Sequence, residues 1–450
     1  MEYKGDTIAA ISTPIGIGGI AVIRISGENS IEIVTEIFTG NKPFNKAKSH
    51  SVIFGKIVEN DKIIDEVLVT VFKTPNSYTG EDVVEVSCHG STFIANQILQ
   101  IILQKARLAE PGEFTQRAFF NNRLDLTQAE AVGDLINAKT KKSLNAAIQQ
   151  LEGSLYQQIE NLLKKLTDCR TLLELEIDFL EQDVPDIDVS ELENNLLSFK
   201  QELEKLAETG NEGLILRDGL KISLVGAPNV GKSSIFNAFL ETERAIVTPT
   251  PGTTRDYLEE AISLNGYLIR IFDTAGIHNA PDSVEKIGIK RSYEIIKNSH
   301  KILFIIDGNE NDKEYEILKK MVGSNKIIKV LNKIDLFSDK ELEKFRKDYI
   351  FCSAIQENGL KKIKEYLIKD IEISEEELQS GILSNTRQIA AVKRAIKSIQ
   401  SASRSIENKL GFEFTAFDLK EASSALEEII GKITTDDILN HIFENFCIGK

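Results

Sequence analysis

One segment, residues 220–240, constrains the fold of this chain more than any other. It reads LKISLVGAPNVGKSSIFNAFL: a short apolar run, a turn that contains glycines, and then apolar residues with helical spacing. Gly226, Gly231, Lys232 and Ser233 match G-x-x-x-x-G-K-[ST] in the strand–loop–helix context that this motif requires. The segment therefore predicts a loop that binds the phosphates of a nucleotide.

The chemistry of such a loop is electrostatic. Glycines let successive backbone N–H groups point inward, and the N-terminus of the following helix adds positive potential. We expect Lys232 to reach the β and γ phosphate oxygens and the Ser233 hydroxyl to ligate Mg²⁺. The residues of this segment expected to bind nucleotide are Gly226, Asn229, Val230, Gly231, Lys232, Ser233 and Ser234.

Further motifs follow this loop in the order typical of GTPases. DTAG, at 273–276, comes after a strand-like run, where an aspartate can hold Mg²⁺ through water and a glycine N–H can meet the γ-phosphate. NKID follows another apolar run, and the Asp335 carboxylate can accept from guanine N1–H and the 2-amino group, which adenine lacks. These motifs favour GTP over ATP. Their expected nucleotide contacts are Asp273, Thr274, Ala275, Gly276, Asn332, Lys333 and Asp335, with Ser353 and Ala354 closing over the base.

The loop TPGTTRD, at residues 250–256, lies where a switch threonine is expected. We expect Thr254 to be the second Mg²⁺ ligand, with Thr253 as the alternative. Position 277 is isoleucine, where many small GTPases carry a glutamine that orients the attacking water. An apolar side chain cannot do this, and no arginine finger is assured. The domain therefore needs another water-orienting group and another cation.

Periodicity divides the 450 residues into four parts. Residues 1–118 mix strands and helices, 119–214 and 372–450 are helical, and 215–371 alternates strand and helix as a parallel sheet requires. The predicted fold class is multidomain. It comprises an α+β N-terminal domain, a discontinuous α-helical domain, and an inserted Ras-like α/β P-loop GTPase domain, since an insertion only needs the inserted ends to lie close together.

Local patterns predict individual elements. Leucines and isoleucines spaced by three and four across residues 144–166 imply one long helix. Ser190 and Glu193 form a capping box for another helix, which Gly210 can end. In the N-terminal part, strands are expected at 8–11, 20–25, 51–58, 67–72 and 83–88, and a helix at 94–106.

The net charge of −15 argues against binding nucleic acid through overall charge, but it leaves room for a local basic patch. Lys139, Lys141 and Lys142 form a small cluster, for which a solvated helix face is the simpler interpretation. The cysteines at 88, 169, 352 and 447 lack metal-type spacing and favour a reducing cytosol. We expect a cytoplasmic protein without a signal peptide or membrane span.

The chain resembles the MnmE (TrmE) tRNA-modification GTPases along nearly its whole length. The segments that carry the resemblance are DTIAAISTPIGIGGIAVIRISG, GEDVVEVSCHG, PGEFTQRAFFNNRLDLTQAEAVGDLI, GAPNVGKSS, TPTPGTTRD, DTAGIH and the terminal FCIGK. The resemblance implies that residues 1–118 bind folate and dimerise, that 119–214 and 372–450 form one helical domain, and that 215–371 is the inserted G domain.

The resemblance also implies a reaction and partners. The expected homodimer acts with the FAD-dependent MnmG (GidA) subunit, as a heterotetramer, on C5 of the wobble uridine in certain tRNAs. It adds a carboxymethylaminomethyl or aminomethyl group, using a one-carbon unit from 5-formyl- or 5,10-methylene-tetrahydrofolate. GTP hydrolysis is required, with Mg²⁺ bound, and the G domains dimerise across their switches with K⁺ bound.

Site residues implied by the resemblance answer the two gaps noted above. K⁺ ligands fall on Asn229, Thr248, Thr250 and Thr253, which would supply the missing cation, and Thr248 also belongs to the GTP-binding set. The water-orienting glutamate falls on Glu285. Folate contacts fall on Arg24, Glu85, Arg123 and Lys450, where the arginines suit carboxylates and Glu85 suits the pterin edge; the terminal cysteine of the modification chemistry falls on Cys447.

Two positions depart from the family pattern. Arg123 stands where lysine is more usual, which keeps the charge but changes the hydrogen-bond geometry, and His278 replaces a more usual arginine after DTAG. Without the resemblance, Glu285 and the folate set would be surface charges, and Cys447 would simply pack after two phenylalanines. A ribosome-assembly GTPase, and a folate enzyme in which GTP is only structural, are the alternative functions.

Overall fold

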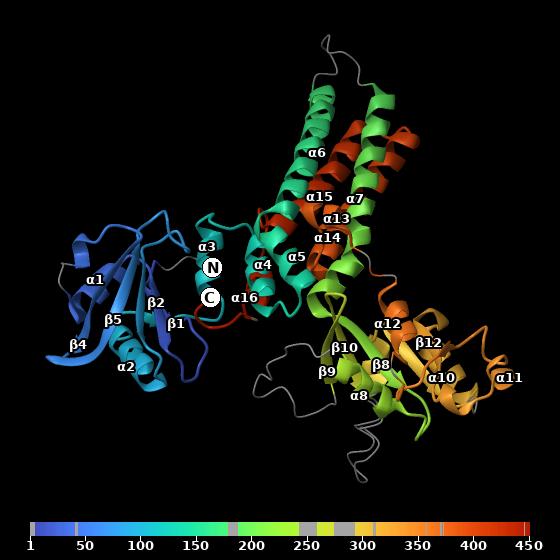
Figure 1. Cartoon of the computed structure of the whole chain (residues 1–450). Coiled ribbons are helices and arrows are strands. Elements are labelled where there is room, and N and C mark those ends of the chain that lie inside the picture. The colour runs from blue at the N-terminus through green and yellow to red at the C-terminus, as the bar shows by residue number, and fades with distance from the viewer. Residues whose placement is uncertain are drawn as a thin grey trace, which may run out of the picture. The chain divides into compact units, whose positions relative to one another are not determined.

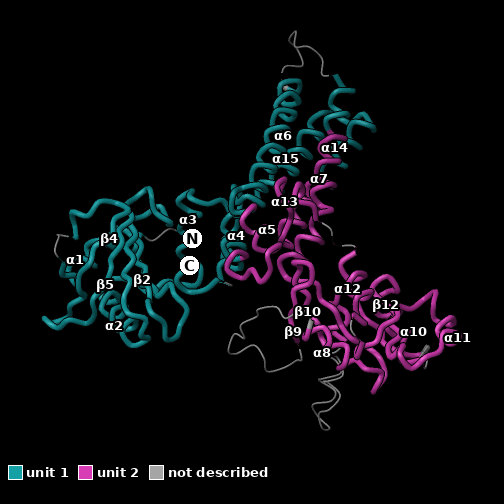
Figure 2. The backbone as a smooth tube through the Cα atoms, in the orientation of Figure 1, with its two compact units in different colours: residues 1–133, 150–195, 397–450 teal, residues 134–149, 196–396 magenta. Residues whose placement is uncertain are grey.

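The computed structural model describes residues 5–40, 44–178, 188–242, 259–273, 293–308, 312–356, 358–369, 371, 373–444 and 446–450. The chain forms two compact units, shown in Figure 2. Unit 1 contains residues 1–133, 150–195 and 397–450, and unit 2 contains residues 134–149 and 196–396. The chain thus leaves unit 1 and returns to it. The four segments expected from the sequence do not coincide with these units, and their bounds stay a prediction.

Unit 1 is built on a seven-stranded sheet with the order β3-β4-β5-β6-β2-β1-β7. Figure 1 labels its strands β1, β2, β4 and β5. All neighbours are antiparallel except β1 and β7, which are parallel. The strands are β1 (Ile8–Ile11), β2 (Ile20–Ser26), β3 (Phe38–Gly40), β4 (Ser51–Glu59), β5 (Lys62–Phe72), β6 (Val83–His89) and β7 (Arg107–Leu108).

Two helices cover one face of this sheet. α1 (Ser30–Ile37) and α2 (Thr92–Ile102) pack Val34 and Ile98 onto strand residues such as Ile23 and Val69, and all four side chains are fully buried. The opposite face carries Arg24 and Glu85, which are register partners on β2 and β6. The expected strands are confirmed, although β5 begins five residues earlier than predicted and α2 ends at Ile102.

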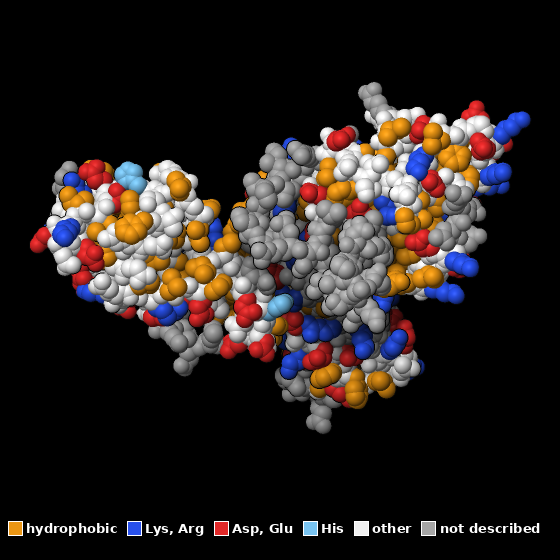
Figure 3. Space-filling view, turned by 90° about the horizontal axis from the view of Figure 1, so that it is seen from below, with side chains coloured by type: hydrophobic (Ala, Val, Ile, Leu, Met, Phe, Trp, Pro, Cys, Tyr) orange, Lys and Arg blue, Asp and Glu red, His pale blue; other side chains and the backbone are white. Residues whose placement is uncertain are grey.

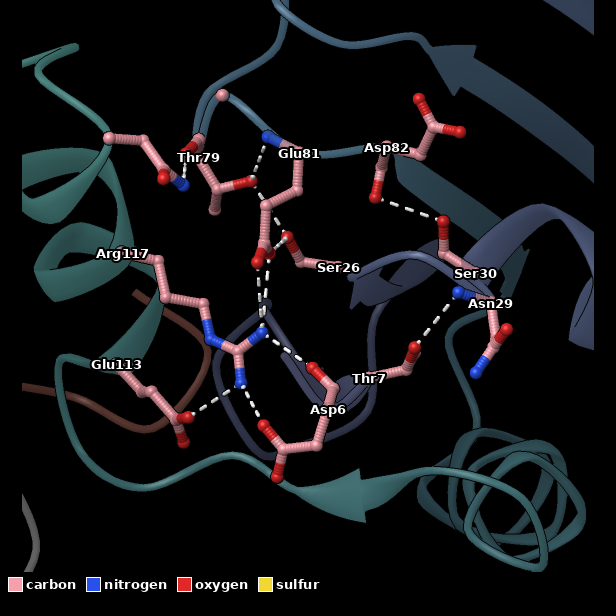
Figure 4. Close-up of polar contacts among 12 residues, drawn as sticks. Asp6, Thr7, Ser26, Asn29, Ser30, Thr79, Glu81, Asp82, Glu113 and Arg117 are labelled. Carbon is pink, nitrogen blue, oxygen red and sulfur yellow. Dashed lines mark hydrogen bonds and ion pairs between the residues drawn. The ribbon is translucent and has the colours of Figure 1, made fainter. Parts of the chain in front are cut away.

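A buried ion cluster ties α3 (Glu113–Phe120) to the sheet (Figure 4). The Arg117 side chain is only 4% exposed and donates to Asp6 Oδ1 at 2.7 Å and Glu113 Oε1 at 2.9 Å, while its other terminal nitrogen reaches both Glu81 oxygens at 3.2 Å. Burial acts to raise the pKa of Asp6, but hydrogen bonds and charge from Arg107 and Arg117 outweigh it, so the pKa is lowered. The cluster joins the start of β1, the loop before β6 and α3.

Helices make up the rest of unit 1 and connect it to unit 2. α6 (Ser154–Asp178) packs against α15 (Phe412–Ile430), and α16 (Asp436–Phe443) contacts α3. Four helices contain residues of both units: α4 (Leu126–Asn137), α5 (Lys141–Leu151), α7 (Val189–Asp218) and α14 (Thr386–Glu407).

Three helix predictions are wrong. The long helix expected across residues 144–166 is broken into α5 and α6 at Gly153, whose φ of +92° is a left-handed conformation that a continuous helix excludes. Gly210 does not end α7, because the helix continues to Asp218 and Gly210 instead lets the side chain of Ile389 approach closely. The Asp188 side chain, rather than that of Ser190, accepts from the first N–H groups of α7.

Unit 2 contains a six-stranded sheet with the order β13-β12-β11-β8-β10-β9, in which only β9 is antiparallel to its neighbour. The apolar side chains of its central strands are buried, as expected for a parallel sheet covered on both faces. This confirms the inserted α/β domain of the predicted fold class. The strands are β8 (Leu220–Val225), β9 (Glu259–Leu264), β10 (Tyr267–Asp273), β11 (Lys301–Ile306), β12 (Ile327–Leu331) and β13 (Ile350–Phe351).

Helices cover both faces of this sheet. α8 (Lys232–Thr242) and α12 (Lys361–Ile368) share one apolar cluster with the strands, and α10 (Asp312–Val322) shares another on the opposite face. No helix in the described part of the chain is long and apolar enough to cross a membrane. The remaining short elements are α11 (Asp339–Leu342), α13 (Glu375–Ser380) and the 3₁₀ turns η1 (Phe44–Lys46), η3 (Ser324–Lys326) and η4 (Ile334–Leu336).

The buried cluster gives a prediction about stability. Arg117→Leu leaves Asp6, Glu81 and Glu113 without their shared cation, so it should destabilise the first sheet by about 3–5 kcal/mol. Native-state hydrogen exchange of β2 and β6 amides in the full chain measures this. Lys105→Leu is the control, because its pair with Glu36 is roughly half exposed and should change stability by about 1 kcal/mol or less. Equal effects of the two substitutions would contradict the prediction.

Candidate functional site

The phosphate loop between β8 and α8 depends on the backbone conformations of a few residues. A Cβ atom on Gly226, which has φ +153°, would lie 2.2 Å from the carbonyl oxygen of Ile305. A Cβ atom on Gly231, with φ +95°, would lie 2.2 Å from Asn332 Nδ2. Both positions therefore require glycine, because neighbouring segments approach the loop too closely for any side chain. Asn229, at φ +66°, adopts a left-handed conformation that asparagine tolerates.

The Lys232 side chain spans this loop. Its Nζ donates to the carbonyl oxygens of Gly226 at 2.7 Å and Ala227 at 2.8 Å. Desolvation by burial lowers its pKa, although the carboxylate of Asp273 opposes the shift. A partly desolvated ammonium group at this place is suited to phosphate, which would replace the weaker carbonyl acceptors.

Two oxygen ligands meet beside the lysine. Ser233 Oγ lies 3.4 Å from Asp273 Oδ2, because parallel pairing of β8 with β10 sets Asp273 opposite Leu224. The described residues contain no cluster of three His, Cys, Asp or Glu side chains that could hold a metal. A hydroxyl and one carboxylate suit Mg²⁺, which usually takes few protein ligands and completes its shell with phosphates and water.

The base-recognition motif is hydrogen-bonded to the phosphate loop. Asn332 Nδ2 donates to the Val230 carbonyl oxygen at 2.9 Å, and Lys333 Nζ donates to the Asn229 carbonyl oxygen at 2.8 Å. Ser353 Oγ donates to Asp335 Oδ1 at 2.6 Å, which orients that carboxylate. These contacts place the two motifs side by side, so that one nucleotide could contact both.

Two residues that the sequence reasoning missed complete this region. Asp307, just after β11, accepts from Lys333 Nζ at 2.9 Å and so fixes the lysine stem. The Cys352 thiol lies 3.5 Å from Asn332 Oδ1, which also accepts from the Ala354 N–H at 3.3 Å. Asp307 could have been found from its place directly after an apolar strand, where GTPase motifs gather; nothing in the pattern around Cys352 indicated its role.

The remaining nucleotide and cation residues lie outside the described residues. They fall in the segments 243–258 and 274–292. The residues concerned are Thr248, Thr250, Thr253, Thr254, Thr274, Ala275, Gly276 and Glu285, together with Ile277 and His278.

A second polar cluster lies on the open face of the sheet in unit 1. Arg24 Nε and Nη2 donate to Glu85 Oε1 at 2.9 and 2.8 Å, and Arg24 Nη1 reaches the Gly449 carbonyl oxygen at 3.4 Å. Ser12 Oγ donates to the same carbonyl at 3.0 Å, which holds the C-terminal segment against the sheet. Desolvation and the charge of Arg24 lower the pKa of Lys450, while Glu85 opposes this.

Arg123 stands apart from that cluster. Its Nε donates to the Ser77 carbonyl oxygen at 3.1 Å, whereas Arg24 lies over the ring of the next residue, Tyr78, 5.3 Å from its centroid. The structure therefore brings together three of the four expected folate contacts, Arg24, Glu85 and Lys450, and sets Arg123 beyond Tyr78.

Cys447 has an exposed thiol, unlike the other cysteines. Phe443 and Phe446 pack against one another, with ring centroids 5.5 Å apart, so the cysteine does not take part in that packing. Burial raises the pKa of Cys88 and Cys169 to about 11 and of Cys352 to about 12, which leaves these thiols protonated and inert near neutral pH.

The small lysine cluster is only partly a solvated face. Lys139 and Lys141 are exposed, but Lys142 Nζ lies 3.9 Å from the centroid of the Tyr267 ring. That lysine is therefore engaged in a cation–π contact within unit 2.

Comparison with known proteins gives family matches at both ends of this fold. Residues 7–123 match the family model of the GTP-binding protein TrmE N-terminus, and residues 126–447 match that of the MnmE helical domain. The tRNA modification GTPase MnmE of Alkaliphilus oremlandii is 41% identical, and that of Clostridioides difficile is 42% identical, with 100% of both chains covered in each case. A solved structure, the G domain of the T. maritima FeoB iron transporter, is 28% identical over 33% of this chain and 97% of its own, with a TM-score of 0.26.

The geometry around Asp335 predicts a change of base specificity. Asp335→Asn replaces an acceptor by a donor, so guanine loses two charge-assisted bonds, and GDP affinity should fall about a hundredfold or more. Xanthine carries an acceptor oxygen in place of the 2-amino group, so xanthosine diphosphate should bind the variant better than GDP. Fluorescence titration with labelled nucleotides measures both. Asp339→Asn, on exposed α11, is the control and should keep GDP affinity; unchanged preference in Asp335→Asn would contradict the assignment.

Proposed function

Because this chain belongs to the MnmE family of tRNA modification GTPases, we propose that its two polar clusters serve one reaction, the modification of C5 of the wobble uridine in tRNA. The chain is a GTP hydrolase. The observation that carries the nucleotide part is the hydrogen-bonded joining of the phosphate loop with Asn332, Lys333 and Asp335. In the proposal, GTP binds there and its hydrolysis drives the modification.

The folate part of the proposal is supported by the cluster at Arg24. Glu85 and the Lys450 ammonium group are complementary to the amide-like edge and the carboxylates of a tetrahydrofolate, and the lowered pKa of Lys450 reflects a site already partly desolvated. A 5-formyl- or 5,10-methylene-tetrahydrofolate would supply the one-carbon unit. In the proposal, Cys447, which is exposed and three residues from Lys450, takes part in that chemistry.

The proposal requires partners beyond this chain. In the proposal, an FAD-dependent subunit of the MnmG type supplies the redox chemistry, and the working assembly is a heterotetramer built on a homodimer of this chain. Acidic and basic side chains are interspersed on the face drawn in Figure 3. With a net charge of −15, tRNA binding therefore depends on local contacts and on these partners rather than on an overall basic surface. We place the reaction in the cytoplasm, where the free thiols stay reduced.

Hydrolysis in the proposal relies on cations and on Glu285. Mg²⁺ is held by Ser233 and Thr254, and K⁺ by Asn229, Thr248, Thr250 and Thr253. K⁺ at the phosphate loop would supply the positive charge that an arginine finger supplies elsewhere. Glu285 orients the attacking water in place of the glutamine that Ile277 replaces.

The test of the function is the nucleoside content of tRNA. In a host that lacks this gene, mass spectrometry should find wobble uridines without the C5 substituent, and the wild-type gene should restore it. Lys232→Ala should fail to restore it, because the phosphates lose their buried cation. Lys340→Ala, on exposed α11, is the control and should restore it fully. Unchanged wobble nucleosides in the deletion host would contradict the function.

The cation assignment predicts a dependence on the alkali metal. Replacing K⁺ by Na⁺ should slow GTP hydrolysis at least about tenfold. Asn229→Gly should abolish the difference, since glycine keeps the left-handed backbone, at φ +66°, without the side-chain ligand. Asn265→Gly, in the β9–β10 turn with φ +49°, is the matched control and should keep the K⁺ preference. Equal rates of the wild type in both salts would refute the assignment of Asn229.

A further inference from the structure

A shallow hollow of about 500 Å³ lies in unit 1 beside the Arg24 cluster. It is formed where β5 ends, at the turn before β4, and by the loop that precedes β6. Tyr78 separates the two places: its ring lies under Arg24 on one side and lines the hollow on the other. The residues that line it, named here the His50–Arg123 hollow, are His50, Phe72, Asn76, Ser77, Tyr78 and Arg123.

The guanidinium group of Arg123 has fewer hydrogen bonds within the protein than that of Arg24, so it is more available to a ligand. Arg24 is committed to Glu85 and to the Gly449 carbonyl. Within the described part of the chain, the side-chain hydrogen bond of Arg123 is the one from Nε to the Ser77 carbonyl oxygen, and the residue lines the hollow. That bond uses Nε and involves neither of the two terminal nitrogens of the guanidinium. Such a group is suited to a carboxylate, which it can hold with two parallel hydrogen bonds.

The surroundings of the hollow favour an anionic ligand. None of its lining residues is acidic. Glu81, on the same loop, is turned away into the ion cluster of Arg117, as Figure 4 shows, and Asp82 accepts from the Thr74 N–H. The backbone N–H of Lys73 donates to Ser49 Oγ, which holds the end of β5 beside the turn that carries His50. Arg123 thus has no carboxylate of this loop competing for it.

We propose that the His50–Arg123 hollow is a subsite for the γ-linked glutamate tail of a folate, and that the protein binds polyglutamyl folates more tightly than monoglutamyl ones. This rests on the proposed function, in which a monoglutamyl folate binds at Arg24, Glu85 and Lys450. The added glutamates of a longer tail then pass Tyr78, and their carboxylates reach Arg123. The proposal explains why Arg123 lies beyond Tyr78, apart from the other three folate contacts: it binds a different part of the ligand.

The number of cations sets how affinity depends on tail length. Each added glutamate contributes one carboxylate, but among the residues that line the hollow Arg123 is the only lysine or arginine. The first additional glutamates should therefore raise affinity, and later ones should add little. Because the pairs are exposed to solvent, the gain should also shrink as the salt concentration rises.

The experiment is isothermal titration of the full chain with 5-formyl-tetrahydrofolate that carries one, three or five glutamates, in low and high salt. In low salt, the triglutamate should bind about tenfold more tightly than the monoglutamate, with little further gain for the pentaglutamate. Arg123→Gln should reduce the gain to about twofold or less, and Arg123→Lys should keep an intermediate gain because charge remains without the bidentate geometry. Lys62→Gln, at the exposed β4–β5 turn, is the matched control and should keep the full gain.

The outcomes separate the subsite from the folate function itself. If the wild type binds none of the three compounds, the proposed folate function fails. If it binds all three with equal affinity, folate binding stands and the subsite is refuted. A full gain that persists in Arg123→Gln, with a thermal transition equal to that of the wild type, also refutes the assignment of Arg123.

Discussion

The close approach of three backbone segments around the phosphate loop is the constraint on which the nucleotide site depends. The loop can lie against the end of β11 and against Asn332 only because Gly226 and Gly231 have no side chain in the way. In return, Asn332 and Lys333 donate to loop carbonyls, so the base-recognition motif is fixed to the phosphate loop. Residues separated by about a hundred positions thereby form one rigid site, as recognition of a nucleotide at both ends requires.

The second site follows a different physical strategy. Its groups are partly buried side chains on the face of the sheet opposite α1 and α2, and a buried ion cluster holds the segments around them in place. Arg117 binds Glu81, which fixes the loop that carries Ser77 and Tyr78, and those two residues contact Arg123 and Arg24. A substitution of Arg117 would therefore shift the positions of Arg24 and Arg123, although Arg117 contacts neither of them directly. The buried ion pair between Arg117 and Glu81 therefore helps to position Arg24 and Arg123.

The fold was predictable where a local pattern determines it. The phosphate loop needs a fixed spacing of glycines and lysine, and the buried parallel strands need continuous apolar runs, so both were visible in the sequence. The helix break at Gly153 was not, because the apolar spacing continues through it and only the backbone conformation reveals it. The helix end predicted at Gly210 was wrong because this glycine allows close packing against Ile389 in the middle of a helix. A glycine in the sequence does not reveal which of these two roles it has. The separation of Arg123 from Arg24 by Tyr78 depends on tertiary packing, which no spacing encodes.

The two sites also differ in the segments that form them. The nucleotide site is built from segments within the sheet of unit 2, each backed by strands. The Arg24 cluster is completed by the last residues of the chain, where Ser12 and Arg24 both bind the Gly449 carbonyl and Phe443 packs closely against Gly112. A segment that few hydrogen bonds hold in place can open at low free energy. A ligand that bridges Arg24 and Lys450 would add contacts only in the closed arrangement, so its binding energy would stabilise the docked terminus and bring the Cys447 thiol to the same place.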